Sequence, residues 1–131
     1  MTGYSGAPLI NKLGIKENMK VKLINAPFDY MDFLDVDISH QLVSNAKNAD
    51  LVHIFAVTKQ ELTKIFLQTI KQAKAGLIIW ISWYKKSAGM QTDITEDSIR
   101  EIVLPTGWVD IKVCAVSDKW SGLKIVKRKV I

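Results

Sequence analysis

Two uninterrupted apolar runs in the second half of the chain constrain its fold more than any other feature. Residues 51–57 and 77–83 are almost entirely apolar, which is typical of strands buried on both faces of a parallel sheet. The segment between them repeats apolar residues with a helical period, begins with the capping box Thr58-x-x-Glu61 and ends at Gly76. Strand, helix and strand in this order predict a right-handed crossover and parallel strands.

The rest of the chain supplies further elements of the same layered type. The patterns predict helices at residues 7–13, from Pro27 onward and from Thr95 to about Pro105, and strands at residues 19–24, near 41–43, 108–116 and 123–130. The last two strands form a hairpin, and in 108–116 the alternation places Val109, Ile111 and Val113 on one face. We therefore expect one three-layer, Rossmann-like α/β domain over residues 1–131. Its mixed sheet of about six strands is parallel except for the last.

Composition narrows the setting of the protein. The chain has 131 residues, 18 Lys and Arg against 13 Asp and Glu, and a single cysteine, Cys114, so it has no internal disulfide. No run approaches the roughly 18 apolar residues of a membrane span. The N-terminus lacks the basic start and apolar core of a signal peptide. A cytoplasmic protein that does not enter membranes is expected.

The second half resembles the class I S-adenosylmethionine-dependent methyltransferases. The resemblance is carried by Asp50-Leu51-Val52, by the turn Lys74-Ala75-Gly76 before an apolar strand, and by Gly107-Trp108 after the last helix. It covers roughly 80 residues and implies a strand–helix series that ends in an antiparallel hairpin.

A second resemblance covers nearly the whole chain. The chain is similar to a family of small uncharacterised bacterial proteins that open with Gly-Tyr-Ser-Gly-x-Pro-Leu. Its motifs correspond here to residues 3–9, 92–96, 109–115 and 120–124, and to Trp83 to Lys86 with Gly89 at a spacing that differs by one residue. This resemblance implies no activity.

The turn after the first strand departs from the methyltransferases. Their cofactor lies over a glycine-rich turn, because close approach of a ligand to the backbone tolerates no side chains. Here the turn reads Asn25-Ala26-Pro27-Phe28, proline removes an N–H group, and no Asp or Glu closes a following strand to hold a ribose. We therefore expect no cofactor, and S-adenosylmethionine is disfavoured.

A ligand site, if present, is expected beyond the carboxyl ends of the strands. These ends fall at residues 25–27, 57–59, 82–86 and 118–121, with the loop 85–93 along the same edge. Tryptophans, lysines and hydroxyls there could stack a base and hold a phosphate. The candidate rim residues are Asn25, Thr58, Ser82, Trp83, Lys85, Lys86, Thr92, Asp93, Trp120 and Ser121.

A purely structural role for the same residues is the alternative. The two indoles would then cover the sheet edge, the lysines would face water, and Thr92 and Asp93 would cap a helix. No catalytic residue and no metal site is predicted, since His40 and His53 have no ligand spacing to Cys114. His53, in the middle of an apolar strand, is expected to be a hydrogen-bonded core residue.

Three functions remain open from the sequence. The first is a degenerate, non-catalytic methyltransferase-like protein that binds a small ligand or a macromolecular partner at this rim. The second is a working methyltransferase with an atypical cofactor turn. The third is a nucleic-acid-binding accessory domain, suggested by the formal charge of +5 and by the tryptophans and lysines of the rim.

Overall fold

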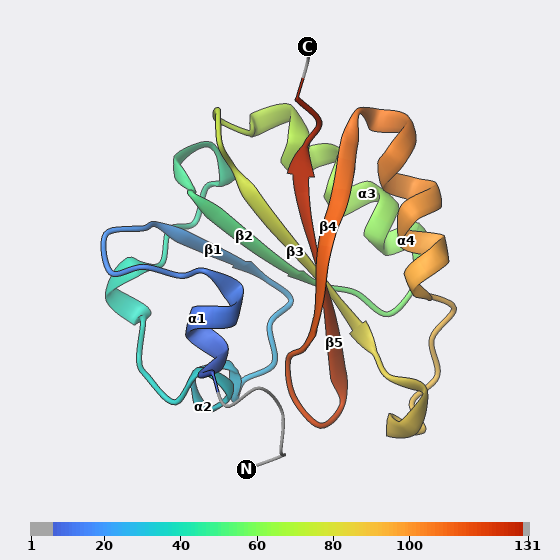
Figure 1. The fold of residues 1–131 in the computed structure, drawn as a ribbon, viewed down its shortest axis with the longest axis horizontal. Coiled ribbons are helices and arrows are strands. Elements are labelled where there is room, and N and C mark those ends of the chain that lie inside the picture. The colour runs from blue at the N-terminus through green and yellow to red at the C-terminus, as the bar shows by residue number, and fades with distance from the viewer. Residues whose placement is uncertain (1–6, 130–131) are drawn as a thin grey trace.

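The computed structural model describes residues 7–129, which form an open, mixed α/β sheet of five strands (Figure 1). The strand order is β1-β2-β3-β5-β4. The first three strands are parallel, and β5 pairs antiparallel with both β3 and β4, as expected of the closing hairpin. The strands are β1 (Val21–Ile24), β2 (Leu51–Phe55), β3 (Ile78–Tyr84), β4 (Trp108–Ala115) and β5 (Trp120–Lys127).

Helices cover both faces of the sheet, so the three expected layers are present (Figure 1). The helices are α1 (Leu9–Leu13), α2 (Tyr30–Leu34), α3 (Lys59–Gln72) and α4 (Glu96–Val103), with single 3-10 turns at Ser39–Gln41, Ala46–Asn48, Lys86–Ala88 and Leu104–Thr106. We call the sheet face under α1 and α2 the first face, and the one under α3 and α4 the second face.

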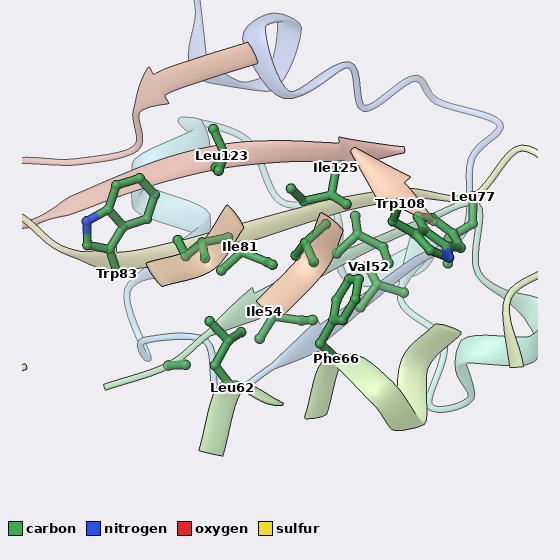
Figure 2. Packing of buried hydrophobic residues seen from close by; sticks show 14 of the residues in the cluster. Val52, Ile54, Leu62, Phe66, Leu77, Ile81, Trp83, Trp108, Leu123 and Ile125 are labelled. Atoms are coloured by element: carbon green, nitrogen blue, oxygen red, sulfur yellow. The ribbon is translucent and has the colours of Figure 1, made fainter. Parts of the chain in front are cut away.

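The core of the second face is built from alternate residues of the predicted strands. Figure 2 shows Val52 and Ile54 of β2 and Ile81 of β3 packed with Leu62 and Phe66 of α3. All residues of β2 are buried, which confirms a strand that is covered on both sides. The remaining residues of β2 and β3 point into the first face, where α1 and α2 pack.

The sheet has one strand fewer than expected, and the missing strand is the one predicted near residues 41–43. Val21 and Leu42 form a single isolated parallel bridge, and the Val43 N–H donates to the Val21 carbonyl at 2.9 Å. The Gln41 side chain donates to the carbonyls of Lys16 and Met19, which holds this segment in a turn rather than along β1. The chain therefore touches the sheet here at one point only.

A β-bulge changes the pattern expected for the C-terminal hairpin. The register of β4 on β5 shifts between Asp110 and Lys112, so Ile111 is an extra residue. Val109 pairs with Val126 and Val113 with Leu123, which places Val109 and Val113 on opposite faces. The expectation that they share a face is wrong.

Three further observations concern a membrane span, a metal site and the N-terminal motif. Within residues 7–129 no helix is long and apolar enough to cross a membrane. The described part of the chain also has no cluster of three or more His, Cys, Asp or Glu side chains that could hold a metal ion. Residues 3–6, which open the bacterial-family motif, lie outside the described residues.

Candidate functional site

A cleft lies where the parallel strands end, the edge at which open α/β sheets bind their ligands. It has a volume of about 780 Å³, within the range of small-molecule sites. Segments that follow β1, β2 and β3 and the hairpin loop between β4 and β5 enclose it. The lining residues are Asn25, Pro27, Phe28, Asp29, Phe33, Phe55, Val57, Glu61, Tyr84, Met90, Val116, Ser117, Asp118, Lys119 and Trp120.

Three aromatic rings that contact one another form one side of the cleft: Phe55, Tyr84 and Trp120. We call this surface the aromatic floor. Trp120 stacks on Tyr84 with ring centroids 4.0 Å apart, and it meets Phe55 edge-to-face at 4.9 Å. Such pairs hold each ring in one orientation. The floor is therefore a rigid apolar surface.

The mouth of the cleft combines exposed apolar side chains with an excess of acid. Phe28 is fully exposed at 102%, and Met90 is 46% exposed. The charged lining consists of Asp29, Glu61 and Asp118 against Lys119. This composition suits a ligand with a flat ring and a positive charge.

The turn after β1 borders the cleft although it contains no glycine. Asn25 has a φ of 58°, in the left-handed region that asparagine tolerates better than most residues. Ala26 and Pro27 follow, and Pro27 lines the cleft with Asn25. The absence of glycine therefore does not close this turn to a ligand.

The residues of the predicted rim do not converge on one concavity. Asn25 and Trp120 line the cleft, and the other eight do not. Trp83 is 8% exposed and packs in the core of the second face (Figure 2), whereas Trp120, also 8% exposed, belongs to the first face. Ser121 pairs with Trp83 and shares its face.

Three polar residues of the predicted rim hold the start of α3. The Thr58 hydroxyl accepts from the Glu61 N–H at 3.1 Å, while the Glu61 carboxylate accepts from the Val57 N–H. The Asp93 carboxylate accepts from the Lys59 N–H at 2.7 Å, and the Thr92 hydroxyl donates to the Val57 carbonyl. Thr92 and Asp93 thus dock the loop before α4 onto the N-terminus of α3, which is a structural role.

The lysines of the rim also lie outside the cleft. The Lys85 N–H donates to the Lys119 carbonyl at 2.9 Å, which extends the pairing of β3 with β5. Lys86 is exposed at the start of a 3-10 turn. Whether any of the ten rim residues binds a ligand stays a prediction.

Sequence reasoning missed several lining residues for identifiable reasons. Phe28 falls within the helix predicted from Pro27 onward, but α2 begins only at Tyr30, so Phe28 projects from the turn. Phe55 falls within the run 51–57, whose apolar pattern predicts only a buried strand. Its place as the last residue of β2 was the available signal, since the carboxyl end of a strand borders the site.

Ser82, the remaining rim residue, is fully buried behind the aromatic floor. His53 Nε2 lies 2.7 Å from Ser82 Oγ, and His53 Nδ1 lies 2.8 Å from the Tyr30 hydroxyl. Burial lowers the pKa of His53 to about 3 and raises that of Tyr30, so both groups are neutral at pH 7. The prediction of a hydrogen-bonded core histidine is confirmed.

Comparison of the whole chain with known proteins places the fold. No family model and no curated protein matches the sequence, so membership of the small bacterial family stays a prediction. Solved structures do match. A protein in the NADB-Rossmann superfamily from Streptococcus agalactiae has a TM-score of 0.62 at 7% identity, with 95% of this chain and 70% of that chain covered.

Two methyltransferases are similar to a comparable degree. The ribosomal protein L11 methylase from Lactobacillus delbrueckii subsp. bulgaricus has a TM-score of 0.59 at 11% identity, over 92% of this chain and 75% of the other. A SAM-dependent methyltransferase from Aquifex aeolicus has a TM-score of 0.57 at 15% identity, over 89% and 86%.

These comparisons correct the expectation about cofactors. Absence of a cofactor was predicted from a turn without glycine, yet the solved structures that this chain matches include a SAM-dependent methyltransferase. The error lies in treating a turn without glycine as closed to a ligand: Asn25, Pro27 and Phe28 line an open cleft, so the side chains of this turn border a ligand-sized space instead of filling it. The chain has a Rossmann-like, methyltransferase-like fold.

Proposed function

We propose that this protein is an S-adenosylmethionine-dependent methyltransferase whose cofactor lies in the cleft at the carboxyl edge of the sheet. One observation carries the proposal: on a methyltransferase-like fold, the cleft at this edge combines an aromatic floor with an acidic mouth. The bound cofactor supplies an activated methyl group on a positively charged sulfur. The residues of this chain bind and orient it.

The side chains around the cleft match the chemical parts of that molecule. The floor formed by Phe55, Tyr84 and Trp120 is an apolar aromatic surface for a purine, and Tyr84 is the most exposed of the three rings. Carboxylates of Asp29 and Asp118 at the mouth attract a sulfonium cation, as aromatic faces also do. Lys119 provides a positive charge for an amino-acid carboxylate.

The charge of the ligand gives a sharp test. S-adenosylmethionine carries a positive sulfur, whereas its demethylated product has a neutral one, so the acidic mouth should favour the methylated form. Isothermal titration of the full chain should show binding of both, with the cofactor bound more tightly. Asp118→Asn should reduce that preference, because it removes one carboxylate from the mouth without a change in size.

Glu101→Gln on α4 is the matched control, since Glu101 is an exposed carboxylate that does not line the cleft. It should leave both affinities unchanged. A wild-type protein whose melting temperature does not rise at millimolar S-adenosylmethionine would overturn the proposal, because a ligand at 100 times its dissociation constant adds about 2.7 kcal/mol.

Binding of nucleic acid stays a separate prediction, suggested by the formal charge of +5 and by the tryptophans and lysines of the rim, of which only Trp120 lines the cleft. Affinity for RNA or DNA that did not fall between low and physiological salt would contradict it, since phosphate contacts release counterions.

A further inference from the structure

A row of three hydrogen-bonded side chains lies buried behind the cleft and takes no direct part in the proposed function. Tyr30 is 2% exposed, and His53 and Ser82 are 0% exposed. A neutral imidazole has one donor and one acceptor nitrogen, while a hydroxyl can act as either. The two flanking hydroxyls therefore satisfy either tautomer of His53.

This row connects three elements, each of which borders the cleft. Tyr30 is the first residue of α2 and directly follows the lining residue Asp29. His53 lies in β2, two residues before Phe55, and Ser82 lies in β3, two residues before Tyr84. The hydrogen bonds thus fix the short helix α2 to the strands that end at the aromatic floor.

The row also contacts the floor directly. The His53 ring stacks on Phe55 with ring centroids 4.4 Å apart and an interplanar angle of 22°. Tyr30 meets the Phe55 ring edge-to-face, with ring centroids 5.7 Å apart and an interplanar angle of 88°. Phe55 in turn packs against Trp120. Hydrogen bonds at both ring nitrogens orient the His53 ring, and its stacked contact favours one plane for Phe55.

We propose that Tyr30, His53 and Ser82 are positioning residues for the cleft. They set the wall formed by α2 against the aromatic floor and so govern ligand affinity without contact with the ligand. This inference rests on the proposed function only for the choice of S-adenosylmethionine as the probe.

The test compares conservative variants of the full chain. Tyr30→Phe keeps the ring but removes the hydroxyl, and Ser82→Ala removes the other hydroxyl. Each should weaken S-adenosylmethionine binding about tenfold, because a small displacement of positioning groups is costly at a ligand site. Ile99→Val is the matched control: Ile99 is fully buried under the second face, so this variant loses stability without affecting the cleft. Its dissociation constant should stay within twofold of the wild type.

A second readout needs no ligand. The Trp120 indole N–H signal, assigned in ¹⁵N-labelled protein by its loss in Trp120→Phe, reports the floor. Tyr30→Phe should shift this signal and speed amide exchange in α2, and Ile99→Val should do neither.

The outcomes separate the two proposals. If the wild type fails to bind S-adenosylmethionine, the proposed function falls and the indole signal alone decides the positioning role. An unshifted Trp120 signal in Tyr30→Phe, or equal loss of affinity in Tyr30→Phe and Ile99→Val, overturns the positioning role.

Discussion

Trp83 and Trp120 lie on opposite faces of the sheet although their strands are paired. Tyr84 is opposite Trp120 and Trp83 is opposite Ser121, so a single step along β3 separates the two faces. Trp120 therefore belongs to the floor of the cleft, while Trp83 packs in the core of the second face. This one-residue offset is the reason that the two tryptophans cannot stack the same ligand.

Burial of neutral His53 makes stability depend on pH. Its pKa is 6.5 in the unfolded chain and about 3 in the fold, so the unfolded state binds the proton more readily. The contribution of neutral His53 to stability is fully present well above pH 6.5 and is lost as the pH falls toward 3. The slope between pH 6 and 4.5 should approach about 1.4 kcal/mol per pH unit. Urea unfolding across this range measures it.

The comparison variant for that measurement is His53→Asn, which should be less stable but should lack the slope. Asp37 and Asp50 do not interfere. Backbone N–H groups of Ser39 and Lys20 hold the pKa of these carboxyls below 3.8, so their contribution is lost only in more acidic solution. A wild-type stability that stays level from pH 6.5 to 4.5 would contradict the neutral histidine.

The left-handed turn at Asn25 predicts opposite effects of two small substitutions. Asn25→Ala should cost about 1 kcal/mol, since a φ of 58° brings its Cβ close to the following carbonyl. Asn25→Gly should be neutral or slightly stabilising. Equal stabilities of the two variants in urea unfolding would show that the backbone does not adopt this conformation.

Exposed Phe28 should contribute to binding but not to stability. Because its side chain is fully exposed, Phe28→Ala removes no buried contact, and the melting temperature should not change. A ligand ring that covers Phe28 would bury apolar area, so the variant should weaken S-adenosylmethionine binding about tenfold, or roughly 1.4 kcal/mol. Leu42→Ala, at an exposed leucine that does not line the cleft, is the control for titration calorimetry and should bind normally.

Gly122 lets β5 pack closely against Val116, Trp80 and Ser82. A Cβ added there would lie 2.9 Å from Val116 Cγ2 and 3.2 Å from the Trp80 ring. Gly122→Ala should therefore destabilise the protein by about 1–3 kcal/mol through overpacking. Ser121→Ala at the adjacent, half-buried position should change stability much less, and the reverse order in urea unfolding would refute this account.

The sequence alone determined the layered architecture. The apolar residues of β2 and β3 predicted buried parallel strands, and Thr58 and Thr95 marked the starts of α3 and α4, where their hydroxyls do accept backbone N–H groups. The antiparallel position of β5 also followed from the hairpin pattern. These features are predictable because periodicity, capping and turn chemistry act between residues that are close in the chain.

Tertiary structure decided which of these residues share a surface. The face that a strand residue occupies depends on register and on bulges such as that at Ile111, and a shift of one residue reverses it. The left-handed φ of Asn25 depends on how β1 leaves the sheet, and the sequence showed only the absence of glycine. The cleft joins side chains from segments up to 95 positions apart, Asn25 and Trp120 among them, so its composition exists only after the strands are paired.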